Sequence, residues 1–509
     1  MARRLLAVAV VCLVVLAGCQ GGMSGDATTD PTTTAPTTEQ MTDAAGTTTQ
    51  PGANASFSYD DPDADTLGWE GGYWYNESIS VDRSDGLNDS ELHTVVNRSM
   101  ARVEVVRGLE FNQSVPVDVI SREEFANDTA ASYENVTRNG TLHQNVKWEA
   151  MFMVGEDENA IDVLASNRAG SVLGYYSPSE DRIAIVSEDT ESPQMDEITL
   201  SQELFHGLQT HRFNTSELNQ STQELHNAKD GIIEGDGNYV DHRYQQRCER
   251  DWDCLRPTDS ESPSGSDRHT GIALTRLQPY SDGPVFVEQL YESGGWDAVN
   301  DVYENPPAST EQTIHPDRYG VDEPTPVSVA DTSTDAWTVP ETGNDSVDFA
   351  SFGEAGLFTM LWYPSYVETQ ATGQPADVVI PTAHLLAPAR NNDTLDLYNY
   401  SHPYTDGWDG DKLVPYAASD SLNTSETAYV WASTWDSASD ATEFADAYRE
   451  LLQYHGAERV SDAGPNVWRI PDDSDSGYAD AFRVTTTEGR VTIVNAPTVD
   501  QLDAVHDSS

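Results

Sequence analysis

Excess negative charge is the feature that most constrains how this chain can fold. The sequence has 86 Asp and Glu residues against 27 Lys and Arg residues, which gives a formal net charge of -59. In dilute buffer such a surface would repel itself and loosen a compact state. In about 1 M salt the Debye length falls to roughly 3 Å, so most of this repulsion is screened. We therefore expect the chain to fold in concentrated salt. The same charge argues against nucleic acid as a partner.

The small number of lysines also indicates a chain that folds in concentrated salt. Only Lys147, Lys229 and Lys412 are lysines, so long apolar lysine stems cover little of the surface. An acidic, lysine-poor composition resembles that of proteins from extremely halophilic archaea. An acidic disordered chain is the alternative, but 11 Trp, 22 Tyr and many apolar periods indicate packed cores.

The N-terminus is typical of an exported protein. Two arginines precede an apolar run over residues 5–15, which is too short to span a bilayer comfortably, and residues 16–19 read Leu-Ala-Gly-Cys. This ending resembles the lipobox of prokaryotic lipoproteins. The resemblance implies a signal peptide over residues 1–18 and lipidation of Cys19, which would anchor the protein to the outer face of the cytoplasmic membrane. An uncleaved signal anchor, or an ordinary signal with a chance cysteine, stays an alternative, and Sec and Tat export are not distinguished.

Residues 19–56 are predicted to form a stalk that begins at the lipidated Cys19. The segment is rich in Thr, Pro, Gly, Ala and Ser, and it contains no Lys or Arg. Such a segment buries too little apolar surface to offset its ordering entropy, so we expect it to be extended and mobile.

Two further features agree with an extracellular location. Cys248 and Cys254 form an isolated pair with few other ligands nearby, which favours a local disulfide over a metal site. Asn-x-Ser/Thr sequons recur along the chain and favour a glycosylated surface protein. The candidate glycosylation sites include Asn76, Asn88, Asn97, Asn112, Asn135, Asn139, Asn214 and Asn423.

The part beyond the stalk is long enough for two domains. A polar stretch over residues 330–345 predicts a boundary between a domain over residues 57–330 and a C-terminal region over residues 345–505. Apolar residues at helical spacing and β-branched runs predict the individual elements. The predicted helices cover 89–111, 197–211, 228–247, 283–304, 353–361 and 439–455, the predicted strands cover 115–120, 428–432 and 489–494, a hairpin covers 174–186, and a short element covers 161–165.

Residues 198–209 carry the side chains best suited to chemistry. Leucine recurs at every fourth position, which predicts a helix with one buried face. Gln202 and His206 stand four residues apart on one face of this helix, with Glu203 beside them. A zinc peptidase helix has His at both of these positions to hold the metal, and Glu to activate a water molecule. Here the first His is replaced by Gln.

Glu234 follows on the next predicted helix. This order resembles that of the gluzincin metallopeptidases, in which a Glu on the next helix supplies the third protein ligand. The likeness covers roughly residues 174–448 and is closest to a haloarchaeal family of surface lipoproteins without an assigned activity. The segments that also resemble this family are residues 286–299, 305–316, 353–357, 407–411 and 435–444.

The resemblance implies an α+β fold with a mainly helical zinc-peptidase-like domain, a small β-sheet and a C-terminal α/β region. It also implies zinc as cofactor, held by His206, Glu234 and the residue at Gln202, with Glu203 as the catalytic base. Gln202 departs from the family pattern, because a Gln carbonyl is a harder and weaker zinc ligand than imidazole. Loss of one ligand predicts a poor zinc site.

The leading hypothesis is therefore a cell-surface lipoprotein with a degenerate gluzincin-like fold. It would be non-catalytic or weakly catalytic, and it would bind peptide, protein or glycan in the envelope. An active extracellular zinc metallopeptidase is the first alternative, with the site completed by Gln202, by another histidine such as His242 or His315, or by a different metal. A solute- or glycan-binding lipoprotein is the second alternative. The sequence leaves the oligomeric state open.

Overall fold

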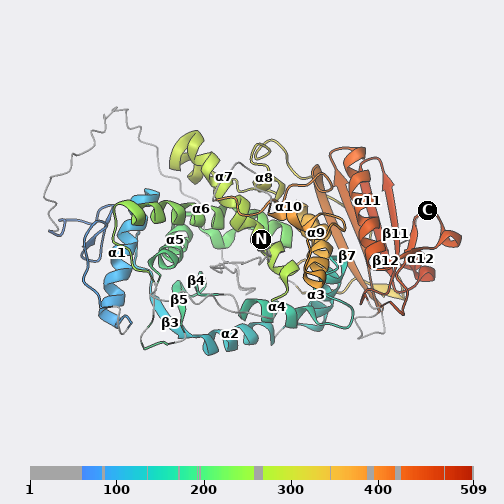
Figure 1. Cartoon of the computed structure of the whole chain (residues 1–509), viewed down its shortest axis with the longest axis horizontal. Coiled ribbons are helices and arrows are strands. Elements are labelled where there is room, and N and C mark those ends of the chain that lie inside the picture. Colours follow the sequence, from blue (N-terminus) through green and yellow to red (C-terminus); the bar gives the residue numbers. More distant parts are fainter. Residues whose placement is uncertain are drawn as a thin grey trace, which may run out of the picture.

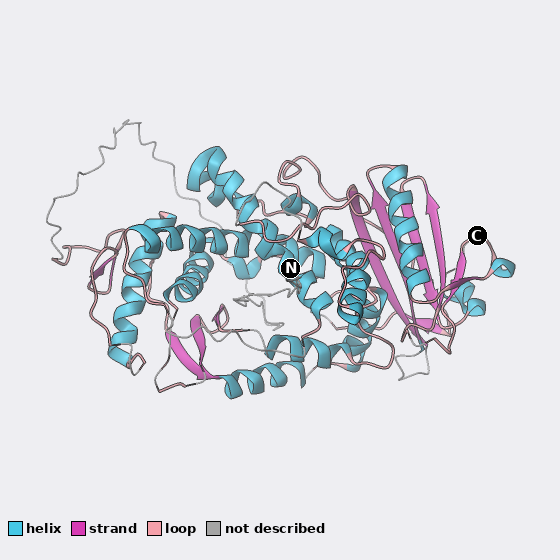
Figure 2. Ribbon diagram, in the orientation of Figure 1, coloured by secondary structure: helices cyan, strands magenta, loops and turns pink. Residues whose placement is uncertain are grey.

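Helices are the commonest secondary structure of the described residues, and one large sheet dominates the C-terminal part (Figures 1 and 2). The computed structural model describes residues 60–82, 86–134, 136–169, 172–187, 189–191, 193, 196–256, 268–343, 346–386, 395–418, 426–474 and 476–506. The predicted signal peptide, the lipidation site Cys19 and the whole predicted stalk lie outside these residues, as do Asn135 and Asn423. The mixture of helices and sheets confirms the predicted α+β class.

Capping residues fix both ends of the first long helix, α1 (Asp89–Arg107). The Asn88 side chain accepts hydrogen bonds from the backbone N–H groups of Ser90 and Glu91, and the Glu91 side chain bonds back to the Asn88 backbone. Gly108 ends the helix with φ 74°, which is why it stops short of the predicted residue 111. The other helices of this part are α2 (Arg122–Glu134), α3 (Arg138–Ala150), α4 (Ala160–Ala169), α5 (Glu197–Phe213), α6 (Gln223–Arg250), α7 (Thr270–Val302) and α8 (Glu311–Ile314).

Helices α6 and α7 cross at very close range. A Cβ atom on Gly235 would lie 2.6 Å from the carbonyl carbon of Gly283, so only glycine fits on α6 at this point. Helix α7 begins at residue 270, earlier than the predicted residue 283, although it contains Pro279 and Pro284. Buried apolar residues in its first half pack into the main core, and this contact offsets the hydrogen bonds that the prolines remove.

A small three-stranded sheet lies beside α5. It has the order β3-β5-β4, with β3 (Val117–Ser121) parallel and β4 (Gly174–Ser177) antiparallel to the central β5 (Arg182–Ser187). These elements confirm the predicted strand and hairpin. The edge strand β4 contacts α5, and a Cβ on Gly207 would lie 3.5 Å from the Tyr176 ring. A separate hairpin of β1 (Trp69–Glu70) and β2 (Tyr73–Trp74) packs on α1.

The C-terminal sheet has seven strands in the order β6-β7-β8-β12-β11-β10-β9. Neighbouring strands run antiparallel, and α11 lies across one face of the sheet, as Figure 2 shows. The strands are β6 (Trp337–Thr338), β7 (Trp408–Ala418), β8 (Thr427–Trp435), β9 (Glu458–Arg459), β10 (Val467–Arg469), β11 (Ala481–Thr487) and β12 (Arg490–Ala496). The helices of this part are α9 (Gly353–Thr372), α10 (Thr382–Leu385), α11 (Ala438–Tyr454) and α12 (Leu502–Val505).

One apolar core extends through both parts of the chain. Trp148 and Leu277, from the first predicted region, belong to the same buried cluster as Phe358, Trp431 and Phe444 from the second. The polar stretch near residues 330–345 therefore connects two regions that share a core. Such a core favours a fixed arrangement over independent domain motion.

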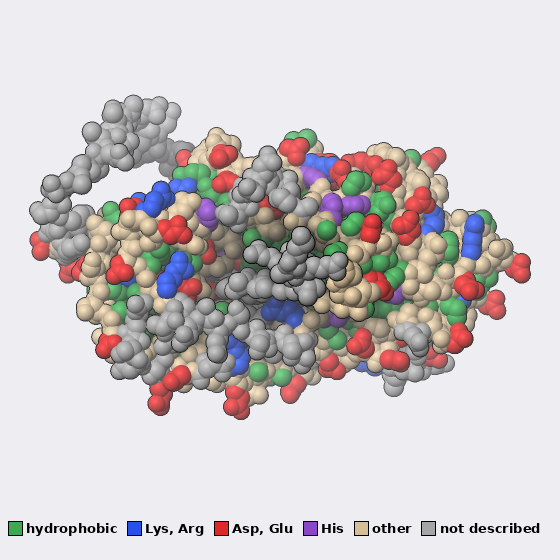
Figure 3. All heavy atoms as spheres, viewed as in Figure 1, with side chains coloured by type: hydrophobic (Ala, Val, Ile, Leu, Met, Phe, Trp, Pro, Cys, Tyr) green, Lys and Arg blue, Asp and Glu red, His purple; other side chains and the backbone are tan. Residues whose placement is uncertain are grey.

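Acidic side chains are scattered over the described part of the face shown in Figure 3. This distribution accords with the formal net charge of -59. Among the described helices, none combines the length and the apolar character that a bilayer span needs.

Candidate functional site

Helix α5 places three of the predicted site residues in the protein interior. Gln202 is 3% exposed, and Glu203 and His206 are fully buried. The prediction of a single buried face was too narrow, because α1, α6 and β4 surround the helix. Polar side chains on α5 therefore face other elements of the protein, where a buried polar group needs a partner.

Helix α6 brings Glu234 against His206. The Oε2 atom of Glu234 lies 3.3 Å from Nε2 of His206, and both side chains are fully buried. Two ligands about 2.0–2.2 Å from a tetrahedral zinc are themselves about 3.4 Å apart, so this separation fits a shared metal. Neither oxygen of Glu234 makes a hydrogen bond of normal geometry with a described residue. His206 and Glu234 therefore fit two protein ligands of a metal site.

Glu203 lies in the same buried group. Its two oxygens also lack hydrogen bonds of normal geometry within the described part of the chain. Burial raises the pKa of Glu203 to about 7; His206 and, more weakly, the Tyr176 backbone counteract this rise, whereas Glu234 adds to it. A carboxyl group with this pKa can take up or release a proton near neutral pH.

Gln202 is where the site departs from a complete set of ligands. It lies one helical turn before His206, and its amide nitrogen has no hydrogen-bond partner among the described residues. A neutral amide offers zinc only a weakly binding carbonyl oxygen. It also carries no positive charge to offset the negative charges of Glu203 and Glu234. His206 and Glu234 are thus suitable metal ligands, whereas Gln202, at the position of the third ligand, is not.

Gly237 on α6 makes room for the imidazole of His206. A Cβ atom at this position would lie 2.9 Å from Cε1 and 3.3 Å from Nε2 of that ring. Only a residue without a side chain lets the two helices approach closely enough for Glu234 to reach His206.

Substitution of Gly237 by alanine should therefore displace the His206 ring. We expect the free energy of unfolding to fall by about 1–3 kcal/mol, the usual cost of overpacking a core. Urea unfolding in high salt measures this loss. Gln245→Ala, at an exposed position of the same helix, is the control and should change stability by less than about 0.5 kcal/mol. Equal stability of the two variants would contradict the close packing inferred here.

A buried chain of hydrogen bonds begins at Nδ1 of His206 and fixes the orientation of its ring. Its Nδ1 lies 3.1 Å from Oε1 of Gln209, and Nε2 of Gln209 donates to the Tyr303 hydroxyl at 2.5 Å. Tyr303 donates in turn to Asp236 at 2.7 Å, and Arg107 pairs with both oxygens of that carboxylate. Since the Gln209 carbonyl accepts, Nδ1 of His206 donates, and in a neutral ring the lone pair lies on Nε2, the atom that faces Glu234.

The sequence did not identify this chain of hydrogen bonds. Arg107 is on α1, Asp236 is on α6 and Tyr303 directly follows α7, and no motif joins them. The only sequence signal was Gln209, which lies one turn after His206 and on the same side of α5.

The candidate histidines His242 and His315, and also His211 at the end of α5, lie elsewhere. His211 contacts Asp181 at 2.6 Å, His315 contacts Glu354 at 3.1 Å, and His242 contacts Gln246 at 2.7 Å. Each is paired with its own neighbour, and none is brought to the group formed by His206 and Glu234.

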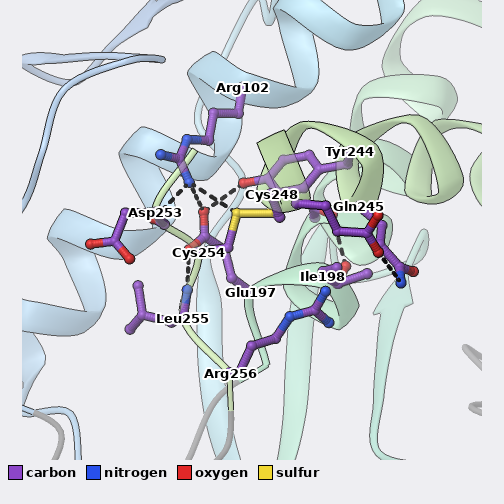
Figure 4. Close-up of a disulfide and its surroundings, with 12 residues drawn as sticks. Arg102, Glu197, Ile198, Tyr244, Gln245, Cys248, Asp253, Cys254, Leu255 and Arg256 are labelled. Atoms are coloured by element: carbon purple, nitrogen blue, oxygen red, sulfur yellow. Dashed lines mark hydrogen bonds and ion pairs between the residues drawn. A yellow bond between two sulfur atoms is a disulfide. The ribbon is translucent and has the colours of Figure 1, made fainter. Parts of the chain in front are cut away.

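Glu197 fixes the start of α5 and lies beside the predicted disulfide, which is present between Cys248 and Cys254 (Figure 4). The fully buried carboxylate of Glu197 accepts hydrogen bonds from Arg98 at 2.9 Å and Arg102 at 2.5 Å. It also accepts hydrogen bonds from the Tyr244 hydroxyl at 2.6 Å and the Leu255 N–H at 2.8 Å. The disulfide loop thus holds the end of α6 against the start of α5.

Removal of the disulfide should lower the free energy of unfolding by about 2 kcal/mol, because the bond closes a short loop. The two cysteines are six positions apart. The Cys248→Ala/Cys254→Ala double variant and urea unfolding test this expectation. A reducing agent should destabilise the natural chain by the same amount and leave the double variant unchanged; an equal response of both proteins would contradict it.

The described sequons differ in accessibility. Asn88, Asn112 and Asn214 are exposed, and Asn76 and Asn139 are half-buried. Asn97 is 7% exposed within α1, and its side chain donates to the Gly71 carbonyl at 3.3 Å. Its burial argues against Asn97 as a glycan acceptor.

Comparison with known proteins adds one finding. Residues 340–506 match a family model described as a domain of unknown function (DUF8575). The matched region contains strands β7 to β12 of the large sheet and excludes α5 and α6, so it carries no information on the site. No curated protein and no solved structure matches the chain.

Proposed function

We propose that this chain is a cell-surface lipoprotein that has the fold of a gluzincin metallopeptidase but has lost most of its zinc affinity. It would serve as a non-catalytic or weakly catalytic binding protein of the envelope, with peptide, protein or glycan as its partner. The observation that carries the proposal is the buried group in which His206 and Glu234 stand 3.3 Å apart while Gln202 takes the place of the remaining ligand.

The energetics of this group favour weak metal binding. Two carboxylates and one imidazole are buried together, and burial of an unpaired charge is costly. A metal would relieve this cost, and zinc would polarise a bound water molecule or carbonyl if it were held there. With Gln202 the protein supplies only two strong ligands. Since even outer-shell changes lower metal affinity about 10–100-fold, loss of a direct ligand should cost more.

The location belongs to the same proposal. The lipobox-like segment ending at Cys19 would tether the chain to the outer face of the cytoplasmic membrane, and the Thr- and Pro-rich stalk would hold the folded part away from it. The acidic surface suits concentrated salt and repels polyanions, which leaves nucleic acid out as a partner.

Metal analysis of protein purified in high salt tests the proposal. We expect much less than one zinc per chain after dialysis, with affinity too low to survive a mild chelator. Glu234→Gln should then leave the zinc content unchanged. One tightly held zinc per chain, lost on Glu234→Gln, would overturn the proposal.

An active metallopeptidase is the second candidate, and one observation favours it. Glu203, next to the proposed ligands, has its pKa raised to about 7 by burial, which suits a general base. Peptide hydrolysis that is abolished both by chelators and by Glu203→Gln would support this candidate. Hydrolysis that survives either treatment, or no hydrolysis at all, would exclude it.

A further inference from the structure

Three basic side chains lie together beside α6, in a chain with only 27 Lys and Arg residues. Lys147 is near the end of α3, Arg168 is near the end of α4, and Arg276 is in the first half of α7. Burial and the charge of Arg276 lower the pKa of Lys147 to about 7, and burial and the charge of Arg168 lower that of Arg276. Arg276 is therefore a neighbour of both other residues. These three residues form the basic group, whose like charges repel one another.

Lys147 is the member of the basic group that points to an anion from outside the chain. It is 8% exposed; its Nζ donates to Oε1 of Gln223 at 3.2 Å and lies 4.7 Å from the centre of the Trp148 ring. Among the described residues no carboxylate forms an ion pair with Lys147, and none lies near enough to raise its pKa. A buried ammonium group normally has an acid as its partner, and this chain has 86 of them. An anionic ligand would supply the missing charge.

Arg276 can contact such a ligand from the solvent side. It is half-buried and bonds to the Tyr133 side chain, and no carboxylate of the described residues forms an ion pair with it. Asp230, on α6, is the acid whose charge reaches Arg276. The Asp230 carboxylate is instead bonded to His226 at 3.2 Å and to Gln220 at 3.4 Å. The guanidinium group therefore keeps its capacity to bind a carboxylate through two parallel hydrogen bonds.

The basic group lies along the same side of α6 as the candidate site. Gln223, which bonds to Lys147, precedes Glu234 by about three helical turns, or about 16 Å along the axis. Asp230, near Arg276, precedes Glu234 by about one turn, or about 6 Å. An extended peptide advances about 3.3 Å per residue. A carboxylate bound by the basic group would thus belong to a residue about two to five positions from the one at the candidate site.

We propose that Lys147, Arg168 and Arg276 form a subsite that binds a carboxylate of a peptide held at the candidate site on α5 and α6. This inference rests on the binding function proposed above and specifies its partner as a peptide with a carboxylate at that spacing. The edge strand β4 contacts α5 and favours a peptide over a glycan, because an edge strand binds an extended peptide through main-chain hydrogen bonds. An acidic side chain and the C-terminus of the peptide offer the same two oxygens.

Fluorescence anisotropy of the full chain with short labelled peptides tests the proposal. The protein is treated with a chelator and kept in molar NaCl, so that binding does not depend on zinc. Each peptide with one Glu is compared with the same peptide carrying Gln, and each free C-terminus with its amide. We expect the carboxylate form of one such pair to bind at least about 10-fold more tightly, the usual gain from hydrogen bonds between charged groups. The pair that shows the difference identifies the source of the carboxylate.

Substitution of Arg276 shows whether the basic group causes this preference. Arg276→Gln should reduce it to less than about 2-fold and leave the binding of the uncharged peptide unchanged, because only the charged partner is lost. Arg276→Lys keeps the charge without the planar fork and should retain a larger preference than Arg276→Gln. Arg250→Gln is the matched control, since Arg250 is exposed on the same face-to-face helix pair's α6 and bonds to Gln246. It should bind both peptides as the natural chain does.

Lys147→Met separates a binding role from a structural one. Replacement of a buried charge without an acidic partner by an apolar side chain of similar length should leave the Tm unchanged or raise it. The preference for the carboxylate peptide should fall in the same variant. A lower Tm together with an unchanged preference would show that Lys147 has only a structural role, and would overturn its place in the subsite.

The proposal is overturned if no peptide binds, if no pair shows a preference for the carboxylate, or if correctly folded Arg276→Gln keeps the preference seen with Arg250→Gln. Binding of an oligouronate in place of every peptide would overturn it in favour of an acidic glycan. One tightly held zinc would refute the proposed loss of zinc affinity and leave the peptide preference of the chelator-treated chain unchanged. The two proposals therefore fail separately.

Discussion

Substitution of Gln202 by histidine is expected to raise the zinc affinity of this protein by at least about 100-fold. The new imidazole would stand one turn before His206 on the same buried face of α5, where Glu234 already lies 3.3 Å from the His206 ring. A third strong ligand would complete a tetrahedral site with one open position, the arrangement that zinc peptidases use. Competition with a chromogenic chelator in high salt measures the change.

The same variant should gain chelator-sensitive peptide hydrolysis, because Glu203 is already in place with its pKa raised to about 7. The Gln202→His/Glu203→Gln double variant is the control, and it should bind zinc without hydrolysing peptide. Gln202→Asn should change neither property. Zinc affinity that stays within a few-fold of the natural chain would show that His206 and Glu234 do not form part of a metal site.

Glu197→Gln should lower the free energy of unfolding by about 3–5 kcal/mol, the cost of leaving a buried charge without its partner. Its carboxylate is fully buried and is the only acid that pairs with both Arg98 and Arg102 among the described residues. The variant keeps the size of the side chain and removes its charge, so two buried guanidinium groups would remain uncompensated. Urea unfolding in high salt measures the loss.

Glu217→Gln is the matched control, because Glu217 is exposed and should change stability by less than about 0.5 kcal/mol. A loss of less than about 1 kcal/mol for Glu197→Gln would mean that Arg98 and Arg102 find other partners or become hydrated. The start of α5 would then be held mainly by apolar packing.

Local patterns predicted the elements around the site well. The apolar spacing that predicted helices over residues 197–211 and 228–247 matches α5 and α6, and the hairpin over residues 174–186 matches β4 and β5. These signals are short-range: a period of 3.6 or 2 residues records which side of an element faces the core.

Elements with weak patterns were missed. Helix α2 buries only Phe125 and Thr129, so its sequence carries almost no apolar period. Strand β7 contains Gly410 and Pro415, which usually mark a turn or an edge, yet it lies inside the sheet between β6 and β8. In both cases contacts with distant segments decided the structure.

By itself, the sequence determined the strongly acidic composition of the chain and the order of residues on each helix. Gln202, Glu203 and His206 had to share one region of α5, because four positions make one helical turn. Only the tertiary structure decided that Glu234 reaches His206 and that Glu197 pairs with two arginines of α1. These partners come from separate elements, and they meet through the packing of whole helices and strands, which no local period encodes.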